Sequence, residues 1–222
     1  MTADYPLVPS RFARGLYAVA RQLLWWIARV AFRVHRTGLE NVPHDGAFIA
    51  AFNHRSNLDT PIAGSALVRR VRFMGKAVLF SKPWSSKFFI TMGAFPVDRE
   101  GNPSAALRAA LKLAEAGESL AMFPEGRRHA GNEIGELQDG LAFIAVRYQI
   151  PIVPVGVAGT EKVLPPNAKF PKFTKVAVVI GPPIIPPVVK DRADRRTAVA
   201  AVNAELRVEL QRVFDDARAE LT

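Results

Sequence analysis

The 222-residue chain has no cysteine and no long apolar run. Without cysteine, disulfides, thiolate nucleophiles and cysteine metal sites are excluded. The longest stretch without a charged residue, Val176 to Val189, contains four prolines and is shorter than the about 18 apolar residues that a membrane-spanning helix needs. Arg14, Arg21 and Arg29 interrupt the apolar residues near the amino terminus, so no signal peptide is expected either. These absences predict no transmembrane helix and a cytoplasmic location.

Negative charge is also in short supply, since 20 acidic residues face 30 lysines and arginines, a formal net charge of +10. Such a charge predicts attraction to an anionic partner, which is nucleic acid, an acidic membrane or a phosphorylated small molecule. The content of 49% hydrophobic and 23% charged residues is that of a globular protein and excludes disordered and fibrous classes.

The first 36 residues carry an amphipathic pattern. Apolar residues recur at spacings of three and four from Ser10 to Arg36, which predicts a helix with one apolar stripe: Phe12, Leu16, Val19, Leu23, Ile27, Val30 and Val34. Six arginines lie on an arc of about 120° opposite this stripe: Arg11, Arg14, Arg21, Arg29, Arg33 and Arg36. With Trp25 and Trp26 expected at headgroup depth, we interpret residues 1–36 as a membrane-anchoring interfacial helix. A surface helix docked on the core and a nucleic-acid-binding helix are the alternatives.

Residues 37–222 read as one α/β domain, in which a largely parallel or mixed sheet is flanked by helices. Short apolar runs predict buried strands at 47–52, 71–74, 94–97, 120–123, 152–157 and 176–180. Helical patterns occupy 103–116, with Asn102 as its cap, 140–148, and the segment from Asp191 onwards. An active site is expected at the carboxyl ends of the strands.

One such strand end leads into Asn53-His54-Arg55-Ser56-Asn57-Leu58-Asp59. His54 and Asp59 would face apart in a regular helix, so they meet only if His54 lies in a loop and Asp59 in the first helical turn. A histidine held at one nitrogen by a carboxylate is free to accept a proton at the other, as a general base does. The alternative is that the histidine is structural.

Cations follow three other predicted strands. Arg99 ends Gly93-Ala94-Phe95-Pro96-Val97-Asp98-Arg99, Arg127 and Arg128 end Phe123-Pro124-Glu125-Gly126-Arg127-Arg128, and Lys76 follows a third run. Guanidinium groups grip phosphate oxygens in bidentate fashion, so several cations at one sheet edge suit a bound phosphate. Taken singly, each is more often an ordinary surface charge.

In order and spacing, these blocks resemble the four motifs of the glycerolipid acyltransferase family, which includes bacterial 1-acyl-glycerol-3-phosphate acyltransferases. Residues 53–59 are similar to its His-x4-Asp block, 93–99 to the second, 123–128 to the third and Ile152-Val153-Pro154-Val155 to the fourth. The resemblance implies that His54 deprotonates an acceptor hydroxyl, Asp59 orients His54, and the hydroxyl attacks an acyl thioester directly. It further implies a phosphate site formed by Arg99, Glu125, Gly126 and Arg128, to which we add Lys76 and Arg127.

The implied co-substrate is acyl-CoA or acyl carrier protein, with no cofactor, and the implied product is phosphatidic acid for phospholipid biosynthesis. The expected partner is an anionic membrane, with the protein peripheral on its cytoplasmic face and no nucleic acid bound. No metal is expected, because His35, His44 and His129 lack metal-ligand spacing.

The sequence also departs from the family pattern. Arg127 stands where relatives usually carry a small hydroxyl residue, and Asp139 where many carry a basic one. Acylation of glycerol-3-phosphate or another lysolipid therefore remains an alternative, as do a lipid-binding module without catalysis and a non-catalytic basic membrane- or nucleic-acid-binding protein.

Overall fold

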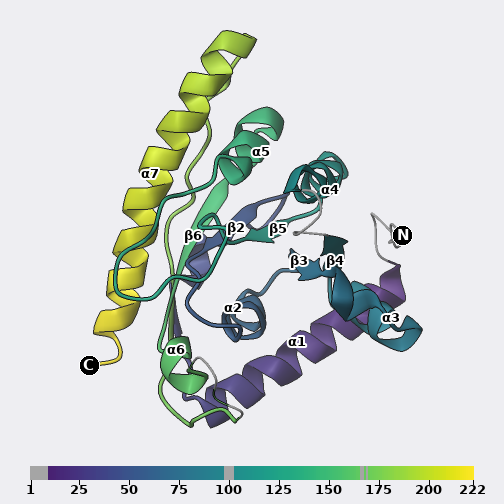
Figure 1. Ribbon diagram of the computed structural model, residues 1–222, viewed down its shortest axis with the longest axis vertical. Helices are drawn as coiled ribbons and strands as arrows, with labels where there is room; N and C mark the ends of the chain where they lie inside the picture. The colour runs from purple at the N-terminus through teal and green to yellow at the C-terminus, as the bar shows by residue number, and fades with distance from the viewer. Residues whose placement is uncertain (1–9, 98–102, 166–167, 169) are drawn as a thin grey trace.

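The computed structural model describes residues 10–97, 103–165, 168 and 170–222, whose strands form one seven-stranded sheet (Figure 1). Its order is β1-β7-β6-β2-β5-β3-β4. All neighbouring strands are parallel except the antiparallel pair β6 and β7. The strands are β1 (His35–Thr37), β2 (Ile49–Phe52), β3 (Arg72–Lys76), β4 (Ala94–Val97), β5 (Leu120–Met122), β6 (Ile152–Ala158) and β7 (Ala177–Ile180).

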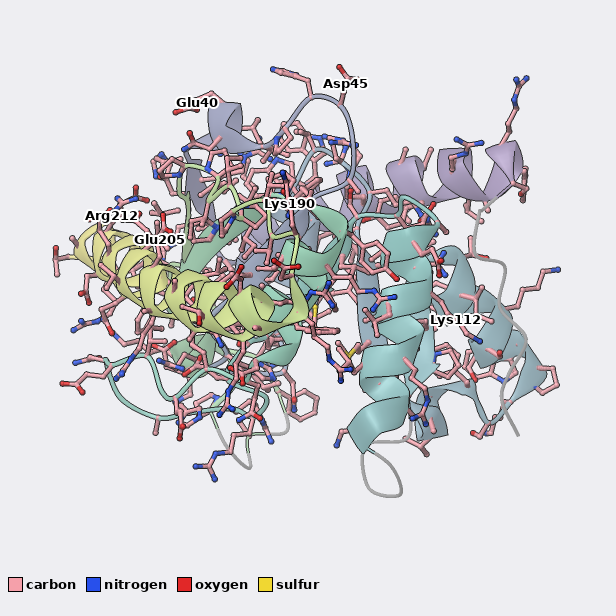
Figure 2. All side chains as sticks on the ribbon, turned by 90° about the horizontal axis from the view of Figure 1, so that it is seen from above. Glu40, Asp45, Lys112, Lys190, Glu205 and Arg212 are labelled. Carbon is pink, nitrogen blue, oxygen red and sulfur yellow. The ribbon has the colours of Figure 1, made fainter. Side chains whose placement is uncertain are left out.

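Helices cover both faces of this sheet. They are α1 (Arg11–Ala31), α2 (Asp59–Ala66), α3 (Pro83–Thr91), α4 (Pro103–Glu115), α5 (Gly140–Tyr148), α6 (Thr160–Val163) and α7 (Arg192–Ala219), with 3-10 turns η1 (Leu39–Asn41) and η2 (Ala77–Phe80). Because side chains alternate along a strand, Ile49 and Ala51 enter a core with α4, α5 and α7, while Ala50 and Phe52 enter a second core with α1 and α2. Lys112 on α4 and Arg212 on α7 lie on the outer surface (Figure 2).

The predicted α/β class with a mixed sheet is confirmed, and each predicted strand overlaps an observed one. The predicted helices at 103–116, at 140–148 and after Asp191 correspond to α4, α5 and α7. Asn102, the expected cap of α4, lies outside the described residues. Strand β1 and helix α3 were not predicted.

The predicted helix from Ser10 to Arg36 is too long. It ends at Ala31, because Arg33 adopts a left-handed backbone conformation (φ 46°) and the next residues join the edge of the sheet as β1. Backbone bonds fix this exit: Val176 N donates to Phe32 O at 3.1 Å and His35 N to Val176 O at 3.0 Å. Arg33 and Arg36 therefore do not belong to the helix's basic face.

Helix α1 turns part of its basic side toward the protein. Arg21 donates to the carbonyls of Ser65 and Leu67 at 3.5 and 3.0 Å, and Arg36 of β1 donates to the Ala66 carbonyl at 2.6 Å. These carbonyls lie at the carboxyl end of α2, where helical backbone leaves acceptors unpaired. The apolar stripe faces outward instead and includes Phe12, Leu16, Val19, Leu23, Ile27 and Val30.

The two tryptophans of α1 have different environments. Trp26 is exposed, but Trp25 is buried, with the Arg36 guanidinium 4.3 Å from its ring centre. The expectation that Trp25 lies at headgroup depth is therefore wrong, because this side chain belongs to the core shared with α2. Among the helices described, none has the length and apolar composition to cross a bilayer.

Helix α7 packs directly on β6. A Cβ atom added to Gly156 would lie 2.1 Å from the Val213 carbonyl oxygen and 2.6 Å from the Phe214 nitrogen, both backbone atoms. Glycine at this position therefore permits the close approach of the helix to the central part of the sheet.

Candidate active site

His54 and Asp59 meet at the end of β2. The strand ends at Phe52, a loop carries His54, and α2 begins at Asp59, as predicted. His54 Nδ1 lies 2.9 Å from Asp59 Oδ2. The Asp59 side chain is fully buried, whereas 14% of the His54 side chain is exposed. The pair thus joins a buried carboxylate to an imidazole that reaches the surface.

Protein donors fix both carboxylate oxygens of Asp59. The Arg55 and Ser56 backbone N–H groups donate to Oδ2 at 2.6 and 2.7 Å, and the Thr160 hydroxyl donates to Oδ1 at 2.5 Å. Thr160 is the first residue of α6 and is itself buried. A carboxylate held in this way has one orientation toward the imidazole.

The contact with Asp59 also determines the tautomer and orientation of the His54 ring. With Nδ1 directed at a carboxylate, the neutral ring carries its proton on Nδ1 and leaves Nε2 as the acceptor. The Phe123 ring stacks on the imidazole at a centroid distance of 4.1 Å and an angle of 26°. Rotation of the ring is therefore restricted from the side of β5, and Nε2 is the nitrogen available to a substrate.

Asn53 ties the loop that carries His54 to the sheet. Its side-chain amide donates to the Val157 carbonyl at 2.9 Å and accepts from the Val157 N–H at 2.7 Å. Both groups are buried. The residue before His54 is consequently fixed to β6, the neighbouring strand.

A buried ion pair lies behind the loop. Arg55 Nη1 is 3.0 and 3.1 Å from the two Glu125 carboxylate oxygens, which also accept from the His54 and Gly135 backbone N–H groups at 2.9 and 3.0 Å. Arg55 Nη2 donates to the Glu133 carbonyl at 2.7 Å. The structure thus gives Glu125 a different place from the predicted phosphate contact: its carboxylate is buried and bound by protein donors.

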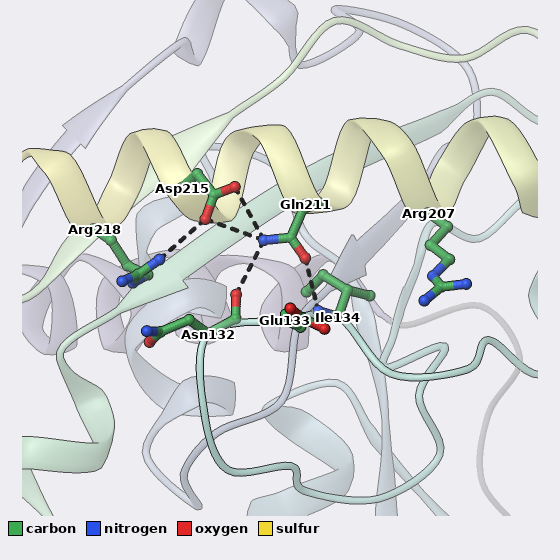
Figure 3. A pocket seen from close by; sticks show the side chains of 7 residues that line it. All are labelled: Asn132, Glu133, Ile134, Arg207, Gln211, Asp215 and Arg218. Atoms are coloured by element: carbon green, nitrogen blue, oxygen red, sulfur yellow. Dashed lines mark hydrogen bonds and ion pairs between the residues drawn. The ribbon is translucent and has the colours of Figure 1, made fainter.

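Helix α7 holds the loop that supplies two of these contacts. Gln211 Oε1 accepts from the Ile134 N–H at 2.8 Å, and Gln211 Nε2 donates to the Asn132 carbonyl at 3.0 Å (Figure 3). Asp215 accepts from the same Nε2 at 3.0 Å. The Gln211 side chain of α7 therefore fixes residues 132–134. This loop supplies the Glu133 carbonyl and the Gly135 N–H that bind the ion pair behind His54.

Three of the predicted cations, Lys76, Arg127 and Arg128, leave the same sheet edge as His54. Strand β5 lies between β2 and β3 and runs parallel to both, so residues that follow these strands emerge together. Lys76, Arg127 and Arg128 are exposed there. Gly126 adopts a left-handed conformation (φ 71°) in the turn before the two arginines, which glycine tolerates without strain. Arg99 lies outside the described residues.

Sequence reasoning gave no role to several residues that build the site. Asn53 and Arg55 flank His54 in the sequence. An amide and a cation beside a candidate base were the signal that could have identified them. Thr160 is 101 positions from Asp59, and Gln211 is 77 positions from Ile134. No local pattern connects residues so far apart.

Comparisons with known proteins agree with this arrangement. Residues 33–158 match the family model described as Acyltransferase. The chain is 31% identical over 146 residues to the 1-acyl-sn-glycerol-3-phosphate acyltransferase of Bacillus subtilis (strain 168), covering 65% of this chain and 70% of that protein. It is 28% identical over 187 residues to the chloroplastic 1-acyl-sn-glycerol-3-phosphate acyltransferase BAT2 of Brassica napus, covering 81% of this chain and 54% of the plant protein.

Among solved structures, the 1-acyl-sn-glycerophosphate (LPA) acyltransferase PlsC from Thermotoga maritima has a similar fold. The TM-score is 0.67 at 24% identity, covering 89% of this chain and 82% of that one. At this identity the likeness describes the fold alone. The chain spans about half the length of the plant relative.

Proposed function

The chain belongs to the acyltransferase family, and from that premise we propose that it acylates the free hydroxyl of 1-acyl-glycerol-3-phosphate. The donor is a fatty acyl thioester of coenzyme A or acyl carrier protein, and the product is phosphatidic acid for phospholipid biosynthesis. The observation that carries the proposal is the buried Asp59 carboxylate, 2.9 Å from an imidazole that is partly exposed at an edge lined with cations.

In the proposed reaction His54 is the general base. Nε2 takes the proton of the acceptor hydroxyl as the oxygen attacks the thioester carbonyl, and Asp59 stabilises the imidazolium that forms. The tetrahedral intermediate collapses by breaking the C–S bond, and the thiolate takes up the proton from His54. The products are one ester and one free thiol, with no acyl-enzyme.

Acceptor binding is assigned to the exposed cations near His54. Arg128 and Arg127 follow β5, and Lys76 ends β3, so the three cations leave the sheet at one edge. Several cations at one edge suit a bound phosphate. We add Arg99 from the family resemblance. Arg127 supplies one more guanidinium than the family pattern has, which favours a dianionic phosphate monoester over a diester.

We further propose that the protein is peripheral on the cytoplasmic face of an anionic membrane. Within the predicted anchor, residues 1–36, the outward face of α1 makes the contact, and the sheet from β1 onwards forms the acyltransferase domain. Supporting this, Phe12 and Val30 are 80% and 75% exposed on α1, and Val19 between them is 67% exposed. No acidic residue occurs between Asp4 and Glu40. An outward apolar stripe with basic neighbours is typical of an interfacial helix.

The first experiment measures free thiol released from acyl-CoA with and without lysophosphatidic acid, in wild type and His54→Ala. We expect acceptor-dependent release in wild type and a loss of about 10²- to 10⁴-fold in the variant. His44→Ala is the matched control, because His44 is exposed before β2 and therefore at the opposite edge of the sheet. A rate unchanged in His54→Ala would refute the assigned base.

A substrate panel tests the acceptor and donor. Glycerol-3-phosphate and lysophospholipids with diester headgroups replace lysophosphatidic acid, and acyl carrier protein replaces coenzyme A. The proposal expects the highest kcat/KM with lysophosphatidic acid. A higher kcat/KM with glycerol-3-phosphate or a diester lysolipid would contradict the proposed acceptor and identify that compound instead.

A further inference from the structure

The segment from η2 through α3 exposes large apolar side chains that the proposed chemistry does not use. Val78 is 71%, Trp84 70% and Phe88 54% exposed, and Leu79 is also on the surface. Trp84 and Phe88 are four residues apart in α3 and therefore lie on one face of that helix. Exposed large apolar side chains grouped in this way are a candidate interaction surface.

Aromatic packing beneath this segment holds those side chains outward. The Phe80 and Phe89 rings contact each other at a centroid distance of 6.0 Å, and Phe88 meets Phe89 edge-on at 5.4 Å. A Cβ atom on Gly75 of β3 would lie 2.7 Å from the Phe80 ring. Phe80 thus packs on the sheet and Phe89 packs on Phe80, while Trp84 is exposed to an external partner.

The charges of the segment have one sign. Lys76, Lys82 and Lys87 are exposed among the apolar residues, and no acidic residue occurs between Asp59 and Asp98. A merely solvated helix face usually mixes both signs. Lysines beside tryptophan and phenylalanine complement the interface of an anionic bilayer, where the cations meet headgroups and the rings enter the apolar boundary.

This surface also continues that of α1. Helix α3 lies against α1 in its amino-terminal part (Figure 1), and α1 carries the outward apolar stripe and its own basic residues. Segment η2 begins directly after Lys76, at the sheet edge from which His54 emerges. A membrane that touches both helices would therefore lie next to the candidate active site.

We propose that η2 and α3 form a second bilayer-contact element, which places Trp84 and Phe88 in the interface of an anionic membrane. The inference rests on the proposed function in that both require a lipid surface near His54. An acidic protein, such as an acyl carrier protein, is the competing partner of the same charge. The bilayer is favoured because the apolar residues of α3 extend those of α1.

The decisive measurement uses the fluorescence of Trp84. The chain has three tryptophans, so Trp25→Phe combined with Trp26→Phe leaves Trp84 as the only one. Vesicles of phosphatidylcholine with phosphatidylglycerol are added to the full-length protein, and co-sedimentation is measured in parallel. We expect a blue shift of the emission on binding and quenching by lipids brominated along their acyl chains.

Two results would overturn the proposal. One is protein that sediments with the vesicles while Trp84 keeps water-like, unquenched emission, in which case α1 binds alone. The other is emission that shifts with acyl carrier protein but not with vesicles, which would assign the face to a protein.

A second set of variants tests the energetic contribution without relying on tryptophan replacement in α1. Trp84→Ser with Phe88→Ser is expected to weaken vesicle partitioning about 10-fold or more, because two large side chains no longer leave water. The matched control is Val208→Ser, which removes a 67% exposed apolar side chain from α7. An equal loss in both variants, or none in the double variant, contradicts the proposal.

Acyl transfer to a water-soluble, short-chain lysophosphatidic acid separates this inference from the proposed function. Without vesicles, the double serine variant is expected to retain the wild-type rate. Absence of transfer in the wild type would refute the proposed reaction, whereas the Trp84 emission would still report whether α3 meets the bilayer.

Discussion

Arg55 and Glu125 form a buried ion pair in which one guanidinium nitrogen lies 3.0 and 3.1 Å from the two carboxylate oxygens. Their side chains are 2% and 0% exposed. The pair joins the loop after β2 to the loop after β5, and it also receives the backbone N–H of His54. The pair therefore holds the loop that carries His54 in place from its buried side.

Glu125→Gln is expected to lower both stability and kcat, since it removes the charge opposite Arg55. Breaking a buried pair from one side costs about 3–5 kcal/mol. Denaturant unfolding and steady-state kinetics measure the two effects, with the exposed Glu136→Gln as control. A raised KM for the acceptor with normal stability and kcat would instead support direct contact between Glu125 and the phosphate.

Thr160→Val is expected to reduce kcat about 10-fold at nearly unchanged acceptor KM. The substitution keeps the shape but removes the hydroxyl that donates to Asp59 Oδ1. A hydrogen bond to a charged group contributes about 1.5–3 kcal/mol. Thr160→Ser retains the donor and should restore most of the rate; failure of serine to do so would show that the methyl packing, and not the hydroxyl, matters.

Gln211→Ala is expected to loosen residues 132–134 and lower kcat several-fold. The variant loses the bonds to the Ile134 N–H and the Asn132 carbonyl. Hydrogen exchange of the amides at 132–135 should accelerate, because local opening becomes easier. Arg207→Ala, which alters the same hollow (Figure 3), is the control. Unchanged exchange in Gln211→Ala would remove this glutamine from the support of the site.

Gly156→Ala is expected to destabilise the protein by about 3 kcal/mol or more, as overpacking against immobile atoms does. The new methyl group would meet the Val213 backbone, which cannot rotate away. Gly15→Ala on α1 has no atom within 4 Å of the added carbon and should stabilise the helix by about 0.5–1 kcal/mol. Thermal unfolding compares the two, and equal effects would contradict the close packing of α7.

The sequence predicted the sheet well because buried strands are short apolar runs between turn residues. It overestimated α1 because Val34 continues the apolar spacing past the backbone break at Arg33. Helix α3 was missed because its aromatic residues show little periodicity: Phe89 faces inward next to the exposed Phe88.

The orientation of α1 and the contacts between residues far apart in the chain could not be predicted, because local patterns do not determine them. The helical pattern of α1 distinguishes an apolar from a basic face, but it does not say which face packs on the protein. The bonds from Arg21 to the Ser65 and Leu67 carbonyls show that the basic side does so in part. Spacing placed His54 and Asp59 together because five residues constrain them locally. The placement of Thr160 beside Asp59 depends on how the whole sheet is assembled.

Asn53 extends the pairing of β2 with β6 by one residue beyond the end of the strand. Strands β2 and β6 are paired up to Phe52 and Val155, and the Asn53 amide imitates one further peptide group by bonding both ways to Val157. The backbone of His54, the next residue, is thus held at a fixed position relative to β6, as in a pair of hydrogen-bonded strands. Arg127 and Arg128 stand on an exposed turn after β5, and the backbone N–H of the next residue, His129, donates to the His54 carbonyl at 2.9 Å. In the proposed reaction, the base is therefore positioned by the strand spacing of the sheet, whereas the proposed phosphate contacts Arg127 and Arg128 lie on an exposed turn.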